Sequence, residues 1–162
     1  ADHMLQLKVG AGSLDEAVIR QCEEVINNND FDFAPMAAEL IEDLSRELKK
    51  ARLSRFSDNY TLSAMTDLVM QIKGNAALFH YPLVSKIAEI LLFFLENIQE
   101  FDTEAVEVVD AHHKTISKLI SQRIQKDDGT LGTDFEKELK SLCGRYFSRR
   151  KIRPEDAYFV DV

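Results

Sequence analysis

The side chains that could do chemistry gather on one predicted helix, which spans roughly residues 61–79. Its apolar residues recur at steps of three and four, so one face is expected to be buried and the opposite face exposed. The exposed face and its margins offer a carboxylate, an amide, an ammonium group and a flexible thioether beside two small residues. A thioether next to small residues suits an adaptable surface for docking another protein. The six candidate partner-binding residues are Asp67, Met70, Gln71, Lys73, Gly74 and Ala77.

The order of motifs along this part of the chain resembles a known signature. Ile72-Lys73-Gly74 is followed by a helix end at His80-Tyr81-Pro82, and then by an apolar helix that closes on Leu95-Glu96. This arrangement resembles histidine phosphotransfer (HPt) domains, whose signature is His-x-Leu-Lys-Gly. Met70 stands where that family has its phospho-accepting histidine. The resemblance therefore implies a degenerate member of the family.

The resemblance also implies roles for the matching residues. In the family, the lysine supplies positive charge near the phosphoryl group, and the glycine makes room for a receiver domain. Lys73 and Gly74 match these two residues, whereas the thioether of Met70 forms no stable phosphoryl adduct. The protein is therefore expected to be a non-catalytic adaptor in two-component signalling. It would bind a receiver or histidine-kinase domain without accepting phosphate.

Two other interpretations of the same helix stay open. Asp67 and Gln71 form an acid-x-x-x-Gln pair, similar to the element with which helical phosphatases of chemotaxis signalling position a water molecule in a receiver domain. The second alternative is a helical adaptor unrelated to phosphorelay. No glycine-rich phosphate loop, Ser-His-Asp set or metal-type cluster is visible in the sequence. The sequence thus argues against an enzyme and predicts neither a cofactor nor a metal.

Three further histidines could replace the missing acceptor. His80 ends the candidate helix, where the family usually has glycine, and points roughly a quarter-turn away from Met70. His112 and His113 are adjacent on a later helix, so their side chains point about 100° apart and do not form an i, i+4 metal pair. The sequence favours surface or boundary histidines held by a neighbouring acid, with Asp110 and His113 on a shared face.

A basic cluster stands out near the end of this acidic chain. It could bind an acidic partner surface or a phosphorylated group. The alternative is a solvated helix end that the helix dipole favours. Its members are Arg145, Arg149, Arg150, Lys151 and Arg153.

Helical periodicity throughout the chain predicts an all-α fold, an antiparallel up-and-down bundle. We expect a four-helix HPt-like core within residues 5–125, and an additional C-terminal helix and tail, 126–162, packed on the same domain. Residues 1–4 are expected to be a cloning remnant. Ser13 and Thr133 are predicted N-caps of the first and last helices, and Asp102 or Thr103 that of the fifth. The predicted helices are approximately 14–27, 33–52, 61–79, 83–97, 103–125 and 133–147.

Composition narrows the class of protein. The chain has 162 residues and a net charge of −8, which makes nucleic acid an unfavourable partner. Its two cysteines, Cys22 and Cys143, lie too far apart in the sequence to suggest a disulfide framework or a zinc site, so a reducing cytoplasm is expected. The longest apolar run, Ile87–Leu95, is too short to span a membrane. The oligomeric state is left open.

Overall fold

The computed structural model describes residues 16–21, 33–53, 59–126 and 129–154. The chain divides into two compact units, Ala1–Asp32 and Phe33–Val162. Within the first unit, residues 16–21 are helical, in agreement with the helix predicted over 14–27. The predicted cloning remnant, the Ser13 cap and Cys22 lie outside the described residues.

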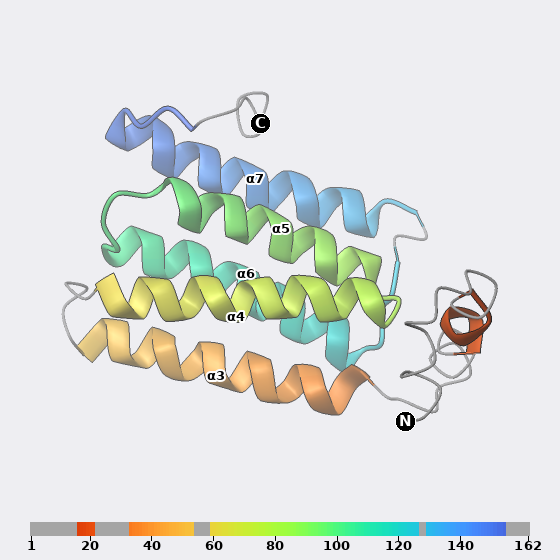
Figure 1. Cartoon of the computed structure of the whole chain (residues 1–162). Coiled ribbons are helices and arrows are strands. Elements are labelled where there is room, and N and C mark those ends of the chain that lie inside the picture. The colour runs from red at the N-terminus through yellow and green to blue at the C-terminus, as the bar shows by residue number, and fades with distance from the viewer. Residues whose placement is uncertain (1–15, 22–32, 54–58, 127–128, 155–162) are drawn as a thin grey trace. The chain divides into compact units, whose positions relative to one another are not determined.

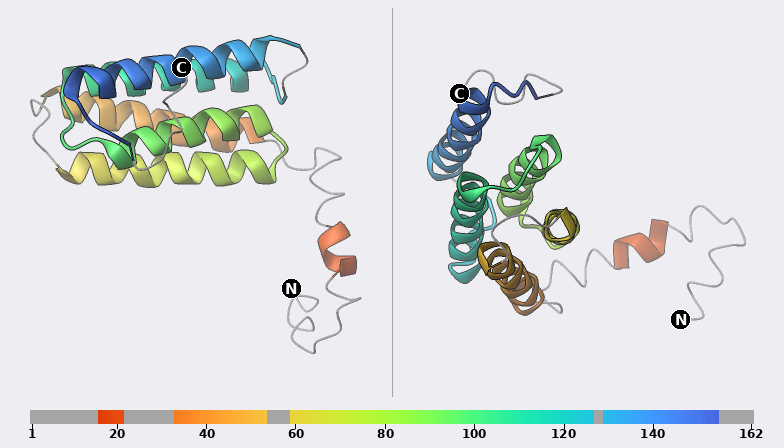
Figure 2. Two further views of the ribbon diagram at one scale, coloured as in Figure 1. Left: turned by 90° about the horizontal axis from the view of Figure 1, so that it is seen from above. Right: turned by 90° about the vertical axis from the view of Figure 1, so that its left-hand side faces the viewer.

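The second unit is a bundle of antiparallel helices (Figure 1). Consecutive helices run in opposite directions and pack against one another, and α6 packs back on α3, so α3 to α6 close a four-membered ring. The last helix packs on both α5 and α6 and runs parallel to α5 (Figure 2). The predicted all-α, antiparallel bundle is confirmed. The helices are α3 (Phe33–Leu53), α4 (Asn59–Leu78), α5 (Pro82–Asn97), α6 (Thr103–Ser121) and α7 (Leu131–Arg150).

The buried positions explain why these segments form helices that pack. On α4 the apolar residues at steps of three and four, Met65, Val69, Ile72 and Ala76, are all fully buried. Helix α5 contacts α4, α6 and α7, and it is correspondingly apolar around most of its circumference. Burial of so many apolar side chains is the main favourable term in folding. No helix in the described part of the chain is both long and apolar enough to cross a lipid bilayer.

Helix starts agree with the sequence at α6 and differ at α7. The Asp102 carboxylate accepts a hydrogen bond from the Ala105 backbone N–H at 2.9 Å, so Asp102 is the N-cap of α6. The prediction that Thr133 caps α7 is wrong, because the helix begins at Leu131. The backbone N–H of Asp134 already donates to the Thr130 carbonyl at 2.8 Å. The position of the cap is therefore taken by Thr130, which makes no side-chain capping bond.

In the described part of the chain, α4, α6 and α7 each end in a left-handed residue that is not glycine. His80, Arg123 and Lys151 have φ values of 64°, 54° and 55° after α4, α6 and α7. In each case the next backbone N–H bonds five residues back, for example Tyr81 N–H to Ala76 O at 2.7 Å. This is the Schellman pattern, in which glycine is the usual left-handed residue. Glycine is thus the residue that this backbone conformation would favour at the position of His80.

Candidate functional site

The exposed side of α4 carries the six residues predicted from the sequence. Met70 is 53% exposed, and Asp67, Gln71, Gly74 and Ala77 are also exposed. They lie opposite the buried residues of the same helix, as the periodicity predicted. We call the line formed by Met70, Gly74 and Ala77 the α4 strip. It is bordered by a further apolar side chain, Leu78, which is 57% exposed.

Gly74 lies in the interior of α4 without a packing reason for its lack of a side chain. A Cβ atom built on Gly74 would meet no heavy atom within 4 Å. A glycine inside a helix costs about 0.5–1 kcal/mol relative to alanine. The chain therefore carries a destabilising residue at a place where its own fold does not need one, and a partner could approach the backbone closely there.

Lys73 borders the α4 strip on the side of α5. Its backbone carbonyl accepts a hydrogen bond from the Ser85 hydroxyl of α5 at 3.0 Å, which ties the two helices together at this level. The Lys73 side chain is half-buried and makes no ion pair with any described residue. Because Lys73 follows Met70 by three residues on the same helix, its ammonium group is available close to the Met70 side chain.

A groove of about 330 Å³ lies between α3 and α4 on the other side of the strip. We call it the α3–α4 groove. Its apolar lining comes from Ala64 and Leu68. Its polar lining residues are Asp43, Arg46, Glu47, Asp67 and Gln71. Among the described residues, neither Asp67 nor Gln71 has a side-chain hydrogen bond or ion pair, so both are free to bind a partner.

The other histidines are occupied elsewhere in the fold. His112 is completely buried, its Nδ1 lies 2.8 Å from the Val108 carbonyl, and burial lowers its pKa to about 4. His113 donates from Nε2 to the Ile41 carbonyl of α3 at 3.1 Å. The predicted pairing of Asp110 with His113 is wrong, because Asp110 instead pairs with Lys114 at 2.9 Å. His113 faces the backbone of the neighbouring helix.

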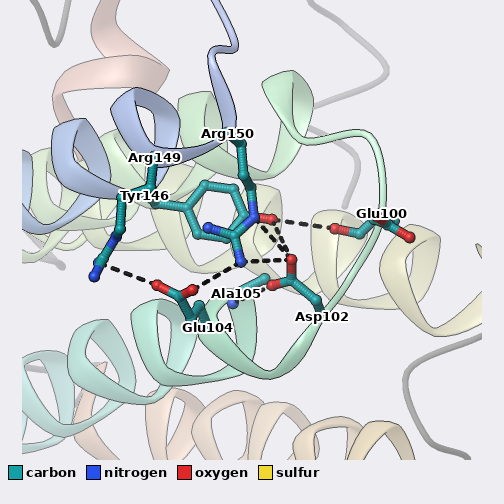
Figure 3. Close-up of polar contacts among 7 residues, drawn as sticks. All are labelled: Glu100, Asp102, Glu104, Ala105, Tyr146, Arg149 and Arg150. Atoms are coloured by element: carbon teal, nitrogen blue, oxygen red, sulfur yellow. Dashed lines mark hydrogen bonds and ion pairs between the residues drawn. The ribbon is translucent and has the colours of Figure 1, made fainter.

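Two residues of the predicted basic cluster bind acids of the same chain (Figure 3). Arg150 donates to the Asp102 carboxylate from Nε at 2.8 Å, and a terminal nitrogen lies 3.1 Å from Glu104. Arg149 pairs with Glu104 at 3.0 Å. The Arg150 guanidinium also lies over the Tyr146 ring, 3.8 Å from its centroid. The solvated-end interpretation is therefore wrong for Arg150, and we call these five residues the α6–α7 clamp.

Tyr146 is the fifth residue of the clamp, and its ring packs against the Arg150 guanidinium. Its hydroxyl is the donor to two acceptors, the Asp102 carboxylate at 3.2 Å and the Glu100 carbonyl at 3.3 Å (Figure 3). Burial, together with the Asp102 charge, raises the pKa of Tyr146. This arrangement was not predicted from the sequence. The i, i+4 spacing of Tyr146 and Arg150 on one face of α7 was the available signal.

Among the described residues, no three His, Cys, Asp or Glu side chains come together as a metal site. Cys143 is buried and unpaired, and burial raises its pKa, so its thiol is unreactive. Comparison of the chain with protein-family models, with curated proteins and with solved structures finds no match.

Proposed function

We propose that this protein is a non-catalytic signalling adaptor that binds a receiver or histidine-kinase domain through the α4 strip. It does so without accepting phosphate. The observation that carries the proposal is the open space above Gly74 next to the exposed thioether of Met70. An exposed helix face with a glycine that internal packing does not explain is suited to close contact with another protein.

The position of the strip within the bundle supports the proposal. Helix α4 is the second member of the four-helix ring, and its outward face is not covered by α7, which packs on α5 and α6. The order Met70, Lys73, Gly74 on this face is the one for which the HPt resemblance implies docking of a receiver domain. The thioether of Met70 offers no site for a stable phosphoryl group.

The positions of the other histidines support the proposal that the protein does not accept phosphate. His112 is buried and His113 is bonded to the α3 backbone, so neither presents a free imidazole beside Gly74. His80 is exposed, but it occupies the left-handed position beyond the end of α4. A phosphoryl group delivered to the α4 strip would therefore meet Met70 and no imidazole.

The test is binding to a panel of purified receiver domains and histidine-kinase dimerisation domains. Gly74→Arg fills the open space above the strip and should weaken binding by at least tenfold, while the fold stays intact. Ala38→Arg, at an exposed position of α3, adds the same side chain elsewhere and should leave binding unchanged. Equal binding by wild type and Gly74→Arg, or unfolding of Gly74→Arg, would contradict the proposal.

A second candidate function is a receiver-directed phosphatase. The favouring observation is that Asp67 and Gln71 line the same groove with side chains that no described residue engages. An amide in that position could orient a water molecule for in-line attack on a phosphoryl group. If so, the wild type shortens the lifetime of a phosphorylated receiver domain and Gln71→Ala does not. An unchanged lifetime with the wild type excludes this candidate.

A further inference from the structure

The α3–α4 groove combines an apolar lining with an acidic rim. Ala64 and Leu68 supply the apolar part, and Asp67 stands at the rim next to the α4 strip. Long cationic side chains fit such places, because their methylene groups cover apolar surface while the charged end reaches an acid. The shape and the chemistry of the groove thus match the side chain of a lysine or an arginine.

Among the described residues, the ion pairs around the groove leave the carboxylate of Asp67 without a partner. Arg46 pairs along its own helix with Glu42 and Asp43. Glu47, which is only 8% exposed, pairs with Lys50 at 2.9 Å. Of the three carboxylates in the lining, Asp43 is thus paired with Arg46 and Glu47 with Lys50. Asp67 remains available to a cation that comes from outside.

We infer that the groove receives a lysine or arginine side chain from a partner helix that packs across the α4 strip. This inference rests on the proposed function and specifies the chemistry of its partner. The exposed side chains of Met70 and Leu78 require an apolar face on the partner, and the open space at Gly74 allows a helix to approach closely. The cation then projects from the edge of that apolar face toward Asp67.

The charges on the two sides of the strip also fix the direction of the partner. Asp67 and Lys73 lie three residues before and three residues after Met70, so they flank it on opposite sides of the helix. Asp67 is on the side that lines the α3–α4 groove. A partner helix with its cation toward α3 gains an ion pair. The same helix turned around would bring its cation toward Lys73, which is repulsive. The groove therefore discriminates between orientations in addition to contributing to affinity.

Asp67→Asn tests the inference against the same panel of receiver and kinase domains. This variant keeps the size of the side chain and removes its charge. At low ionic strength, we expect the variant to bind about three- to tenfold more weakly than the wild type. Added salt should then lower the affinity of the variant less than it lowers the affinity of the wild type. Glu107→Gln, at an exposed position of α6 diagonally across the ring, makes the same change in net charge and should bind like the wild type.

The outcomes separate this inference from the proposed function. Suppose that Gly74→Arg abolishes binding but Asp67→Asn and Glu107→Gln both bind like the wild type. Then the strip is the docking surface, and the inference that a partner cation enters the groove is wrong. If Asp67→Asn and Glu107→Gln weaken binding equally, only the net charge matters and the inference is overturned. If no domain of the panel binds the wild type, both the inference and the proposed function are wrong.

Discussion

His112 shows how burial controls a single titratable side chain. Its ring is completely buried, Nδ1 bonds within α6, and Nε2 has no described partner. The charged imidazolium would lose its hydration there without a compensating acid, so burial lowers the pKa from 6.5 to about 4. The folded protein therefore holds His112 neutral at pH values where the unfolded chain protonates it.

The first prediction is that His112 makes the fold sensitive to acid. Between pH 6.5 and pH 4 the unfolded state binds the additional proton, so the free energy of unfolding falls as the pH falls, by about 3 kcal/mol at most. In His112→Leu this contribution is absent, so the free energy of unfolding should fall by about 3 kcal/mol less over the same pH range. Urea denaturation of both proteins at pH 7 and pH 4.5 measures the difference. Equal pH dependence would show that His112 does not titrate in this window.

The ends of the helices show where the chain departs from the usual residue choice. His80 and Lys151 take the left-handed conformation that costs a residue with a side chain about 1 kcal/mol more than glycine. Both carry a basic side chain, which the negative end of the helix dipole favours when it is charged. The dipole term is smaller than the backbone term, so glycine should still be the more stable choice.

The second prediction follows from this backbone argument. His80→Gly and Lys151→Gly should each raise the free energy of unfolding by about 0.5–1 kcal/mol. Lys137→Gly, at an exposed interior position of α7, should lower it by about 1 kcal/mol. Thermal or urea unfolding measures all three variants. A loss of stability in both His80→Gly and Lys151→Gly would mean that their side chains make contacts worth more than the backbone relief.

The third prediction concerns the α6–α7 clamp, which ties the C-terminal end of α7 to the start of α6. Arg150→Ala removes two charged hydrogen bonds and the contact with the Tyr146 ring, and leaves Asp102 without its cation. It should lower the free energy of unfolding by about 1–2 kcal/mol and speed amide exchange in α7. Arg145→Ala removes a bond to Ser141 within α7 and should change stability by less than about 0.5 kcal/mol. Equal effects of the two variants would show that the clamp adds nothing.

For the molecule as a whole, the sequence predicts what depends on local periodicity. The exposure of Met70 and the burial of Val69 follow from steps of three and four along one helix. The α6–α7 clamp was not predictable in this way, because Asp102 and Arg150 are 48 residues apart and meet only after α7 has packed on α6. The α3–α4 groove likewise depends on which helices become neighbours. Sequence periodicity could therefore predict a candidate surface on one helix, but it could not predict a site formed by two helices.

Within the described helices of the bundle, α7 packs on α5 and α6, whereas Met70 and Leu78 of α4 stay exposed. This division suits a protein in which one side of the ring serves stability and another side serves binding. On our proposal, the α4 strip docks a receiver or histidine-kinase domain, and Met70 occupies the position of the phospho-accepting histidine of a phosphotransfer domain.

The most direct test is to measure phosphoryl transfer from a phosphorylated receiver domain to the wild type and to Met70→His. The wild type should take up no acid-labile label, because Met70 offers no acceptor and the other histidines are not beside Gly74. Met70→His should acquire acid-labile label, and the double variant Met70→His, Gly74→Arg should not. Label on the wild type that disappears with His80, His112 or His113, or no label on a folded Met70→His, would contradict the account.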